Sequence, residues 1–153
     1  MYLTKKTDIG AKWEHNKVTG EVKIKKLDTD VSINLKRVSE ITESVGYWRK
    51  ANQIHRWFVM NVQEGVDNCG EYWVSKEQFE KLLVDCKAVR DNKALAAEVL
   101  PTQPGFFFGG TDYDEYYDGE INDTIEIVEN VLKEMAEDKE SKAYTSYYYS
   151  SSW

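Results

Sequence analysis

The sequence predicts an α+β fold: one helix-dominated domain, residues 1–153, with a small antiparallel sheet from the N-terminal region and the C-terminal tail. Three observations support this prediction. The length of 153 residues is typical of one domain, and no linker or repeat divides the chain. Hydrophobic residues make up 41% of it, which is enough for a core. Apolar residues recur at helical spacing through most of the chain, whereas strand-like alternation is confined to its ends.

The strands are expected near the two termini. Glu21–Leu27 and Val31–Leu35 both alternate apolar and polar residues, and a turn at Asp28–Asp30 would let them pair. At the other end, Ala143–Tyr149 is rich in Tyr and Thr, which favour strands. We expect this last segment to return to a sheet edge.

A long helical stretch, about Leu35–Gln63, is the expected central element. Residues at steps of three and four along it define a core-facing stripe. Gly46 lies inside the stretch and costs about 1 kcal/mol relative to Ala in a helix, so a kink or a division into two helices stays open. The stripe contains Val38, Ile41, Val45, Trp48, Asn52, His55, Val59 and Val62, and Ala51 and Phe58 widen it.

Three more helical segments follow. Ser75–Gln78 has the pattern of a capping box, from which a helix runs to about Arg90. Ala94–Leu100 is a short Ala-rich turn that stops before Pro101, and Asp118–Asp138 is the last long helix. The main buried contributors are expected to be Val45, Trp48, Phe58, Val59, Phe79, Leu82, Leu83, Ile125, Val128 and Leu132.

Charge is unevenly distributed along the chain. The net charge is −7, but residues 1–60 carry +5 and residues 61–153 carry −12. An acidic chain is a poor general nucleic-acid binder, because such binding depends on neutralising phosphates. Asp112–Glu140 holds 12 acids and only two lysines. It is either an acidic face directed at a basic partner or a solvated helix face.

The sequence also bears on location. No stretch approaches the roughly 18 apolar residues of a membrane span, and the N-terminus lacks the apolar core of a signal peptide. Cys69 and Cys86 lie 17 residues apart, with no CxxC pattern and no histidine at metal-ligand spacing. We therefore expect reduced structural thiols, a cytoplasmic location and no membrane partner.

Basic and aromatic residues on the predicted long helix suggest a ligand site. Arg49 and Arg56 lie two turns apart on one flank, near Gln53, with Trp57 on the outward side. An arginine pair offers planar forks for phosphate or carboxylate, and an indole offers a stacking face. This flank could bind a nucleotide-like anion. The alternative is that Trp57 packs under another element and both arginines pair with the acidic half.

Two polar residues, Asn52 and His55, occupy inward positions of the same stripe. If buried, each needs hydrogen-bond partners, since an unpaired polar group costs about 1–3 kcal/mol. For His55, a hydrogen-bonded core histidine is the simpler interpretation. A general base at the floor of a pocket is the more specific functional hypothesis. No nucleophile, metal cluster or cofactor motif accompanies His55, so we predict a non-enzyme without cofactor or metal. Phosphoester chemistry by His55, with Arg49 and Arg56 as anion clamps, is the strongest alternative.

The segment Leu100–Thr111 is unusual in composition. It holds both prolines of the chain and three of its nine glycines. Three consecutive phenylalanines, Phe106, Phe107 and Phe108, cannot all face one core. Rigid turns that hold aromatics beside free backbone amides suit a ligand loop or a partner interface. We therefore include Gln103 and the three phenylalanines among the candidate ligand-binding residues.

The acids that follow this segment do not form a calcium loop. Asp114, Asp118 and Gly119 fit parts of an EF-hand, but Ile125 stands where a bidentate Glu is needed. A looser divalent-metal site from Asp112, Asp114 and Asp118 is one alternative. Acids at a helix N-terminus, which the helix dipole favours, are the simpler explanation.

Three segments carry a resemblance. The chain resembles a family of small phage-encoded accessory proteins in Gly46–Val59, Leu100–Tyr117 and the terminal Tyr-Ser-Ser-Ser-Trp. The similarity covers most of the chain beyond Gly46. It implies a setting, the cytoplasm of an infected bacterial host cell, and supplies no catalytic or ligand residues. By analogy, small phage proteins outside replication and the virion often counter host defence, either by sequestering nucleotide signals or by blocking host proteins.

Two functions are therefore expected. In the first, the protein is a non-enzymatic, host-defence-countering protein that sequesters a small anionic, nucleotide-like ligand through Arg49, Arg56, Trp57 and the Gln103–Phe108 loop. In the second, the Asp112–Glu140 segment imitates nucleic acid and blocks a basic host defence protein. The first is favoured because aromatic residues cluster beside the arginines and in the loop.

Self-association is also expected. The two halves carry opposite charge, and Tyr47 and Trp57 lie outside the main stripe, where large aromatics are typical interface anchors. A terminal strand would add an edge open to pairing. We predict a homodimer or larger closed oligomer in which Tyr147–Trp153 contributes contacts.

Overall fold

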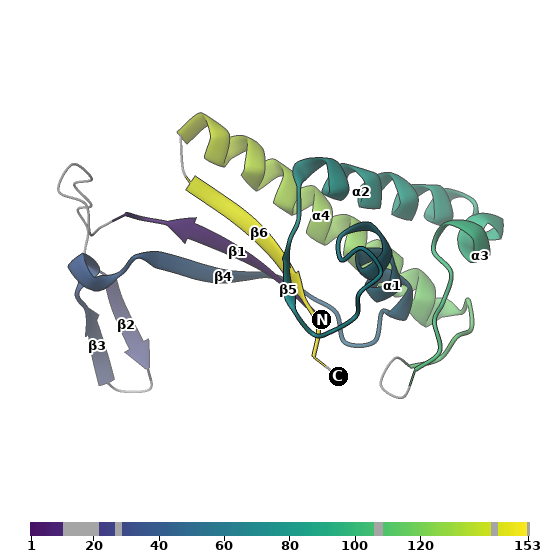
Figure 1. The fold of residues 1–153 in the computed structure, drawn as a ribbon, viewed down its shortest axis with the longest axis horizontal. Coiled ribbons are helices and arrows are strands. Elements are labelled where there is room, and N and C mark those ends of the chain that lie inside the picture. The colour runs from purple at the N-terminus through teal and green to yellow at the C-terminus, as the bar shows by residue number, and fades with distance from the viewer. Residues whose placement is uncertain (11–21, 27–28, 106–108, 142–143, 153) are drawn as a thin grey trace.

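The computed structural model describes residues 1–10, 22–26, 29–105, 109–141 and 144–152. Four strands form one antiparallel sheet with the order β4-β1-β6-β5, and two more form a separate hairpin. Helices pack on the sheet, so the predicted α+β class is confirmed (Figure 1). The strands are β1 (Tyr2–Asp8), β2 (Val22–Lys26), β3 (Thr29–Ile33), β4 (Glu40–Tyr47), β5 (Glu71–Trp73) and β6 (Tyr144–Ser150).

The two N-terminal strands predicted to pair do so. β2 and β3 are antiparallel, with Val22 opposite Ile33 and Lys26 opposite Thr29. Thr29 and Asp30 belong to β3, so the turn predicted at Asp28–Asp30 is misplaced, and residues 27–28 lie outside the described residues. Figure 1 shows this hairpin beyond the ends of β1 and β4, away from α1, α2, α3 and α4.

The C-terminal strand β6 does not lie at a sheet edge, and that prediction is wrong. It pairs with β1 on one side, where Tyr2 is opposite Ser150, and with β5 on the other, where Trp73 is opposite Tyr148. Tyr147 and Tyr149 are buried. β6 therefore offers no open edge for pairing between molecules, which removes one argument for the predicted oligomer.

Residues 35–63 do not form the predicted long helix. They form a short 3-10 turn, strand β4 and a helix that begins only at Asn52. The residues Ile41, Thr42 and Val45 are β-branched and favour a strand, and their spacing suits a strand as well as a helix. The centre of the fold is therefore the sheet. The helices are η1 (Leu35–Arg37), α1 (Asn52–Asn61), α2 (Lys76–Asp91), η2 (Lys93–Leu95), α3 (Ala96–Val99) and α4 (Glu115–Ser141).

Gly46 has a packing role in β4 that a helix would not give it. A Cβ atom at this position would lie 2.9 Å from Cγ2 of Ile127 on α4 and 3.2 Å from Cβ of Leu3. The missing side chain thus lets the sheet and α4 approach closely.

The later helices begin and end close to the predicted positions. The Ser75 hydroxyl accepts a hydrogen bond from the Gln78 amide, and the Ser75 amide donates to the Gln78 side chain, so the capping box at α2 is present. α2 ends at Asp91, one residue beyond the prediction. α4 is longer than predicted at both ends.

The core lies between the helices and one face of the sheet. Phe58 of α1 stacks on Tyr149 with ring centroids 3.9 Å apart, and Phe79 of α2 meets Tyr147 edge-on. Trp48 donates its indole N–H to the hydroxyl of Thr124 on α4 at 2.9 Å. Of the predicted core residues, Trp48, Phe58, Val59, Phe79, Leu82, Ile125 and Val128 are buried, and Val45, Leu83 and Leu132 are partly buried against them.

None of the described helices combines the length and the apolarity that crossing a membrane requires.

Candidate functional site

A pocket of about 470 Å³ lies where the start of α1 meets the segment that leads into α4. Its walls come from two sequence regions, residues 49–53 and 102–120, which only the fold brings together. Its lining residues are Arg49, Lys50, Asn52, Gln53, Thr102, Gly109, Gly110, Asp112, Asp114, Tyr116, Tyr117 and Glu120.

One wall of the pocket is cationic. Arg49 and Lys50 precede α1, and both are exposed. Neither makes an ion pair with any described residue. Their charges are therefore available to a ligand. For Arg49, the alternative of pairing with the acidic half is not found among the described residues.

The lining of the pocket is also acidic. It contains Asp112, Asp114 and Glu120. Glu120 is half-buried and accepts a 3.3 Å hydrogen bond from the Gln53 amide. Burial raises the pKa of Glu120, and the charges of Asp123 and Asp114 add to the rise, while the Gln53 hydrogen bond lowers it. The pocket is thus of mixed charge.

Asn52 fixes the loop that closes the pocket. Its amide nitrogen donates to the Gly110 carbonyl at 2.9 Å, and its amide oxygen accepts from the backbone N–H of Gln103 at 2.8 Å. The hydroxyl of Thr102 donates to the Thr111 carbonyl at 2.9 Å, which joins the two ends of the same loop. The buried side chain of Asn52 therefore attaches the described ends of the loop to α1.

Two neighbouring tyrosines at the start of α4 have different roles. Tyr117 is buried and donates to the Leu100 carbonyl at 2.8 Å, so it anchors the helix against the preceding segment. Tyr116 is 85% exposed and stands at the pocket edge. A ring in this position is free to stack on a flat ligand.

The predicted ligand residues divide between this pocket and its surroundings. Arg49, Asn52 and Gln53 line it, and Gln103 reaches it through the backbone bond to Asn52. Arg56 lies at a second pocket of about 190 Å³ that shares Gln53 with the first. Phe106, Phe107 and Phe108 lie outside the described residues.

Trp57 is not on an outward face, as the long-helix interpretation required. It is only 4% exposed, and its indole N–H donates to Asp85 of α2 at 2.7 Å. Lys81, also on α2, lies over the ring. The alternative that Trp57 packs under another element is confirmed, because α2 covers this side of α1, a neighbour that no local periodicity reveals.

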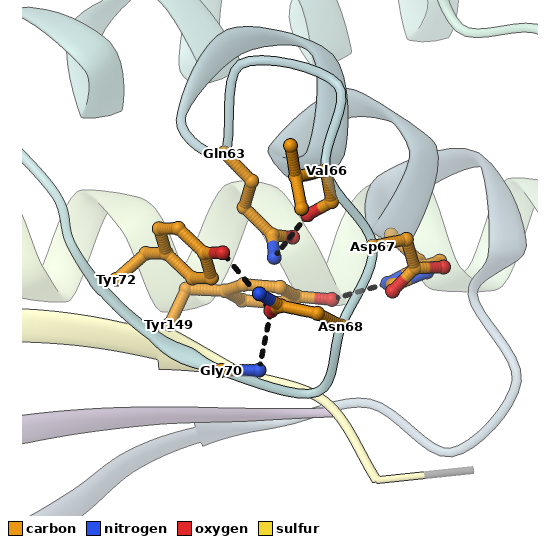
Figure 2. Close-up of polar contacts among 8 residues, drawn as sticks. Gln63, Val66, Asp67, Asn68, Gly70, Tyr72 and Tyr149 are labelled. Atoms are coloured by element: carbon orange, nitrogen blue, oxygen red, sulfur yellow. Dashed lines mark hydrogen bonds and ion pairs between the residues drawn. The ribbon is translucent and has the colours of Figure 1, made fainter.

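His55 occupies a buried position with partners on both ring nitrogens. Its Nδ1 lies 2.7 Å from the Tyr149 hydroxyl and its Nε2 lies 2.9 Å from the Asp67 carboxylate. Figure 2 shows the Tyr149 hydroxyl directed toward the loop that carries Asp67, above the sheet. Burial raises the pKa of Tyr149 far above its usual value, and the charge of Asp67 adds to this, so the phenol stays protonated.

The arrangement around His55 is that of a satisfied core histidine. His55 is not among the residues that line the pocket at Arg49. Two more hydrogen bonds hold the loop that carries Asp67 (Figure 2). The Tyr72 hydroxyl donates to the Asn68 side chain at 2.9 Å, and the Gln63 amide donates to the Val66 carbonyl.

Two acids at the start of α4, Asp114 and Asp118, have structural partners. Asp114 accepts from the backbone N–H groups of Tyr116 and Tyr117 at 3.0 and 3.1 Å, and so caps the helix. Asp118 pairs with Lys93 at 2.5 Å. Within the described part of the chain, no group of three or more His, Cys, Asp or Glu side chains is placed to hold a metal ion.

Both cysteines are free. Cys86 is buried in the core, and burial, with the charge of Asp85, raises the pKa of its thiol to about 12. Cys69 is exposed in the loop before β5.

Comparison of the chain with protein families, curated proteins and solved structures found no match. The function is therefore argued from the site itself.

Proposed function

We propose that the pocket at Arg49 binds a small nucleotide-like ligand and that the protein acts by sequestering it. The observation that carries this proposal is the pair of cations, Arg49 and Lys50, without ion-pair partners among the described residues, on one wall of a 470 Å³ cavity. Pockets of this size suit small organic ligands. An anionic group of the ligand binds at this wall.

The carboxylates that line the same pocket restrict the rest of the ligand. A carboxylate only accepts hydrogen bonds, so the part of the ligand beside Asp112 and Asp114 must donate. A second anionic group there would be repelled. A phosphate at Arg49 and a base that presents N–H groups to the acids match both kinds of lining residue. Tyr116 at the edge supplies a face for that base.

Sequestration accords with the phage setting that the sequence resemblance implies, and the proposal assigns no reaction. The competing proposal, an acidic surface that imitates nucleic acid, has less support. Several acids of α4 are engaged within the molecule: Glu129 pairs with Lys87, and Glu134 and Asp138 both pair with Lys5. A nucleic-acid mimic needs its acids unpaired and outward.

The test is a thermal-shift screen against mononucleotides and cyclic dinucleotides, followed by calorimetric titration of the compounds that stabilise the protein. We expect at least one nucleotide to raise the melting temperature. Arg49→Ala should weaken its binding at least about tenfold, equivalent to about 1.4 kcal/mol. Arg37→Ala, which removes an exposed arginine of η1 outside the pocket, is the matched control and should leave binding unchanged.

Two results would contradict the proposal. One is a melting temperature unaffected by every nucleotide. The other is binding that Arg49→Ala and Arg37→Ala weaken equally, because that would indicate attraction by net charge and not by the pocket.

A further inference from the structure

The two faces of the four-stranded sheet differ in what covers them. One face points to the helices. Alternate residues of β1 and β6 lie on it and either contact α1, α2 or α4 or are buried in the core: Leu3, Lys5, Tyr147 and Tyr149. The intervening residues of the same strands point to the opposite face. No helix contact is described for that second face, which we call the open face.

Four aromatic residues form a band across the open face, one from each strand. The register places Tyr47 of β4 opposite Tyr2 of β1, and Tyr148 of β6 opposite Trp73 of β5. The Tyr2 and Tyr47 ring centroids are 5.3 Å apart. Tyr2 and Tyr148 are diagonal neighbours, because Tyr148 is opposite Thr4. With strands about 4.8 Å apart, the band spans about 14 Å.

Three of the four rings are substantially accessible. Tyr2 is 42% exposed, Tyr47 is 56% exposed and Trp73 is 58% exposed. Tyr148 is half-buried and joins the two pairs. Large aromatics exposed together on one flat surface are uncommon in a soluble chain unless the surface binds something.

The charges around the band argue against an anionic ligand. Lys6 lies 4.6 Å from the Tyr148 ring centroid, but its ammonium is paired with Glu71 at 2.6 Å. The other charged side chains that the register places on this face, Asp8 and Glu40, are acidic. A nucleic acid needs cations for its phosphates, and this face has no surplus of them in the described residues.

The polar residues beside the band are hydroxyl-bearing. Thr4 and Ser44 are opposite each other on β1 and β4, and Ser150 is opposite Tyr2 on β6, all on the open face. Hydroxyls both donate and accept, which suits a ligand that itself carries many hydroxyl groups.

The area of the band is small for a stable dimer. A Tyr or Trp ring buries about 150–250 Å² when fully covered, so these partly exposed rings offer on the order of 400 Å². A stable protein interface takes about 800 Å² from each partner. The band therefore fits a narrow chain better than a second copy of the protein.

We propose that the Tyr47–Tyr2–Tyr148–Trp73 band binds a neutral oligosaccharide. The apolar C–H faces of sugar rings stack on the exposed aromatics, and the sugar hydroxyls bond to Thr4, Ser44 and Ser150. No covalent step is involved. This surface shares no residue with the nucleotide pocket. The saccharide proposal and the nucleotide proposal can therefore be tested independently.

The experiment titrates the full chain with neutral hexasaccharides of glucose, in α-1,4 and β-1,4 linkage, and of N-acetylglucosamine, and follows tryptophan fluorescence and binding heat. At least one hexasaccharide should bind and change the fluorescence, since Trp73 lies in the band. Trp73→Ala and Tyr47→Ala should each weaken binding at least about tenfold. Both side chains are more than half exposed, so both variants should fold.

Tyr144→Ala is the matched control. Tyr144 is 83% exposed on the same strand and face as Tyr148, but four residues away, which is about 13 Å along β6. Its removal should leave saccharide binding unchanged.

Three outcomes would overturn the proposal. The first is the absence of binding to every neutral hexasaccharide at millimolar concentration. The second is binding of single-stranded oligothymidylate, but of no saccharide, that Trp73→Ala abolishes. The third is self-association that Trp73→Ala abolishes in the absence of saccharide binding, which would assign the band to a second copy of the chain.

Discussion

Replacement of Gly46 by alanine tests the packing of the sheet against α4. The added Cβ would lie 2.9 Å from Cγ2 of Ile127, 3.2 Å from Cβ of Leu3 and 3.4 Å from Cη2 of Trp48. Contacts below 3.0 Å force neighbours to move, and overpacking of this kind typically costs about 1–3 kcal/mol. A helix at this position would give the opposite sign, because Gly→Ala in a helix interior gains about 1 kcal/mol.

The assay is equilibrium unfolding in urea, followed by tryptophan fluorescence. A loss of about 2 kcal/mol with a slope of about 2 kcal/mol per molar lowers the midpoint by about 1 M. Gly119→Ala is the matched control, because nothing lies within 4 Å of the added Cβ and Gly119 is inside α4. It should raise stability by about 0.5–1 kcal/mol.

A double-mutant cycle identifies the clash itself. Ile127→Ala removes the Cγ2 atom, so the cost of Gly46→Ala should fall clearly in that background, with a coupling energy of about 0.5–3 kcal/mol. Unchanged or increased stability of Gly46→Ala, or an equal cost with and without Ile127, would refute the close approach of β4 and α4.

Three further predictions concern the polar residues around the sites. Asn52→Ala should cost about 1–3 kcal/mol and speed hydrogen exchange of the Gln103 amide, because the loop loses the Asn52 hydrogen bonds to Gly110 and Gln103. Tyr149→Phe should cost a similar amount in urea unfolding, because Nδ1 of buried His55 loses its hydrogen bond with the Tyr149 hydroxyl. Glu120→Gln should stabilise the protein at pH 7, because a carboxylate with a raised folded-state pKa opposes folding once it is ionised. That gain should disappear as the pH falls below the ordinary glutamate pKa, where both states are protonated, and unfolding curves between pH 3 and 7 measure it.

Elements with local signals could be predicted from the sequence. The capping box at Ser75 needs only four residues, and its two hydrogen bonds are present. The pairing of β2 with β3 and the helical class of α4 follow from periodicity in a short window. In each case the information and the structure lie in the same stretch of chain.

The failures share a different cause. Ile41, Val45 and Trp48 fit a helical stripe, but the same positions suit a strand and the turn that follows it, and pairing with β1 decides between them. The helical periodicity predicts an outward Trp57 because the packing of α2 onto α1 is non-local. The interior position of β6 likewise depends on β5, a strand of only three residues with little signal of its own.

The candidate pocket was predicted only in part for the same reason. Arg49, Asn52 and Gln53 could be proposed from their residue types. Tyr116 and Glu120 become neighbours of these residues only when α4 folds back beside α1. The acids before α4 are a signal of this site, yet the capping role of Asp114 explains part of the same pattern.

The pocket residues differ in how much they serve the fold, and this decides how binding data can be read. Asn52 holds the loop by two hydrogen bonds, so Asn52→Ala would lose binding whether or not a ligand touches it. Gln53 and Glu120 bond to each other, so replacing either alters the other. Arg49 makes no ion pair with a described residue and is exposed. Arg49→Ala should therefore leave the melting temperature of the free protein unchanged. If this variant loses nucleotide binding under that condition, the loss reports on the ligand contact alone. Arg49→Ala thus distinguishes a binding pocket from a structural cavity.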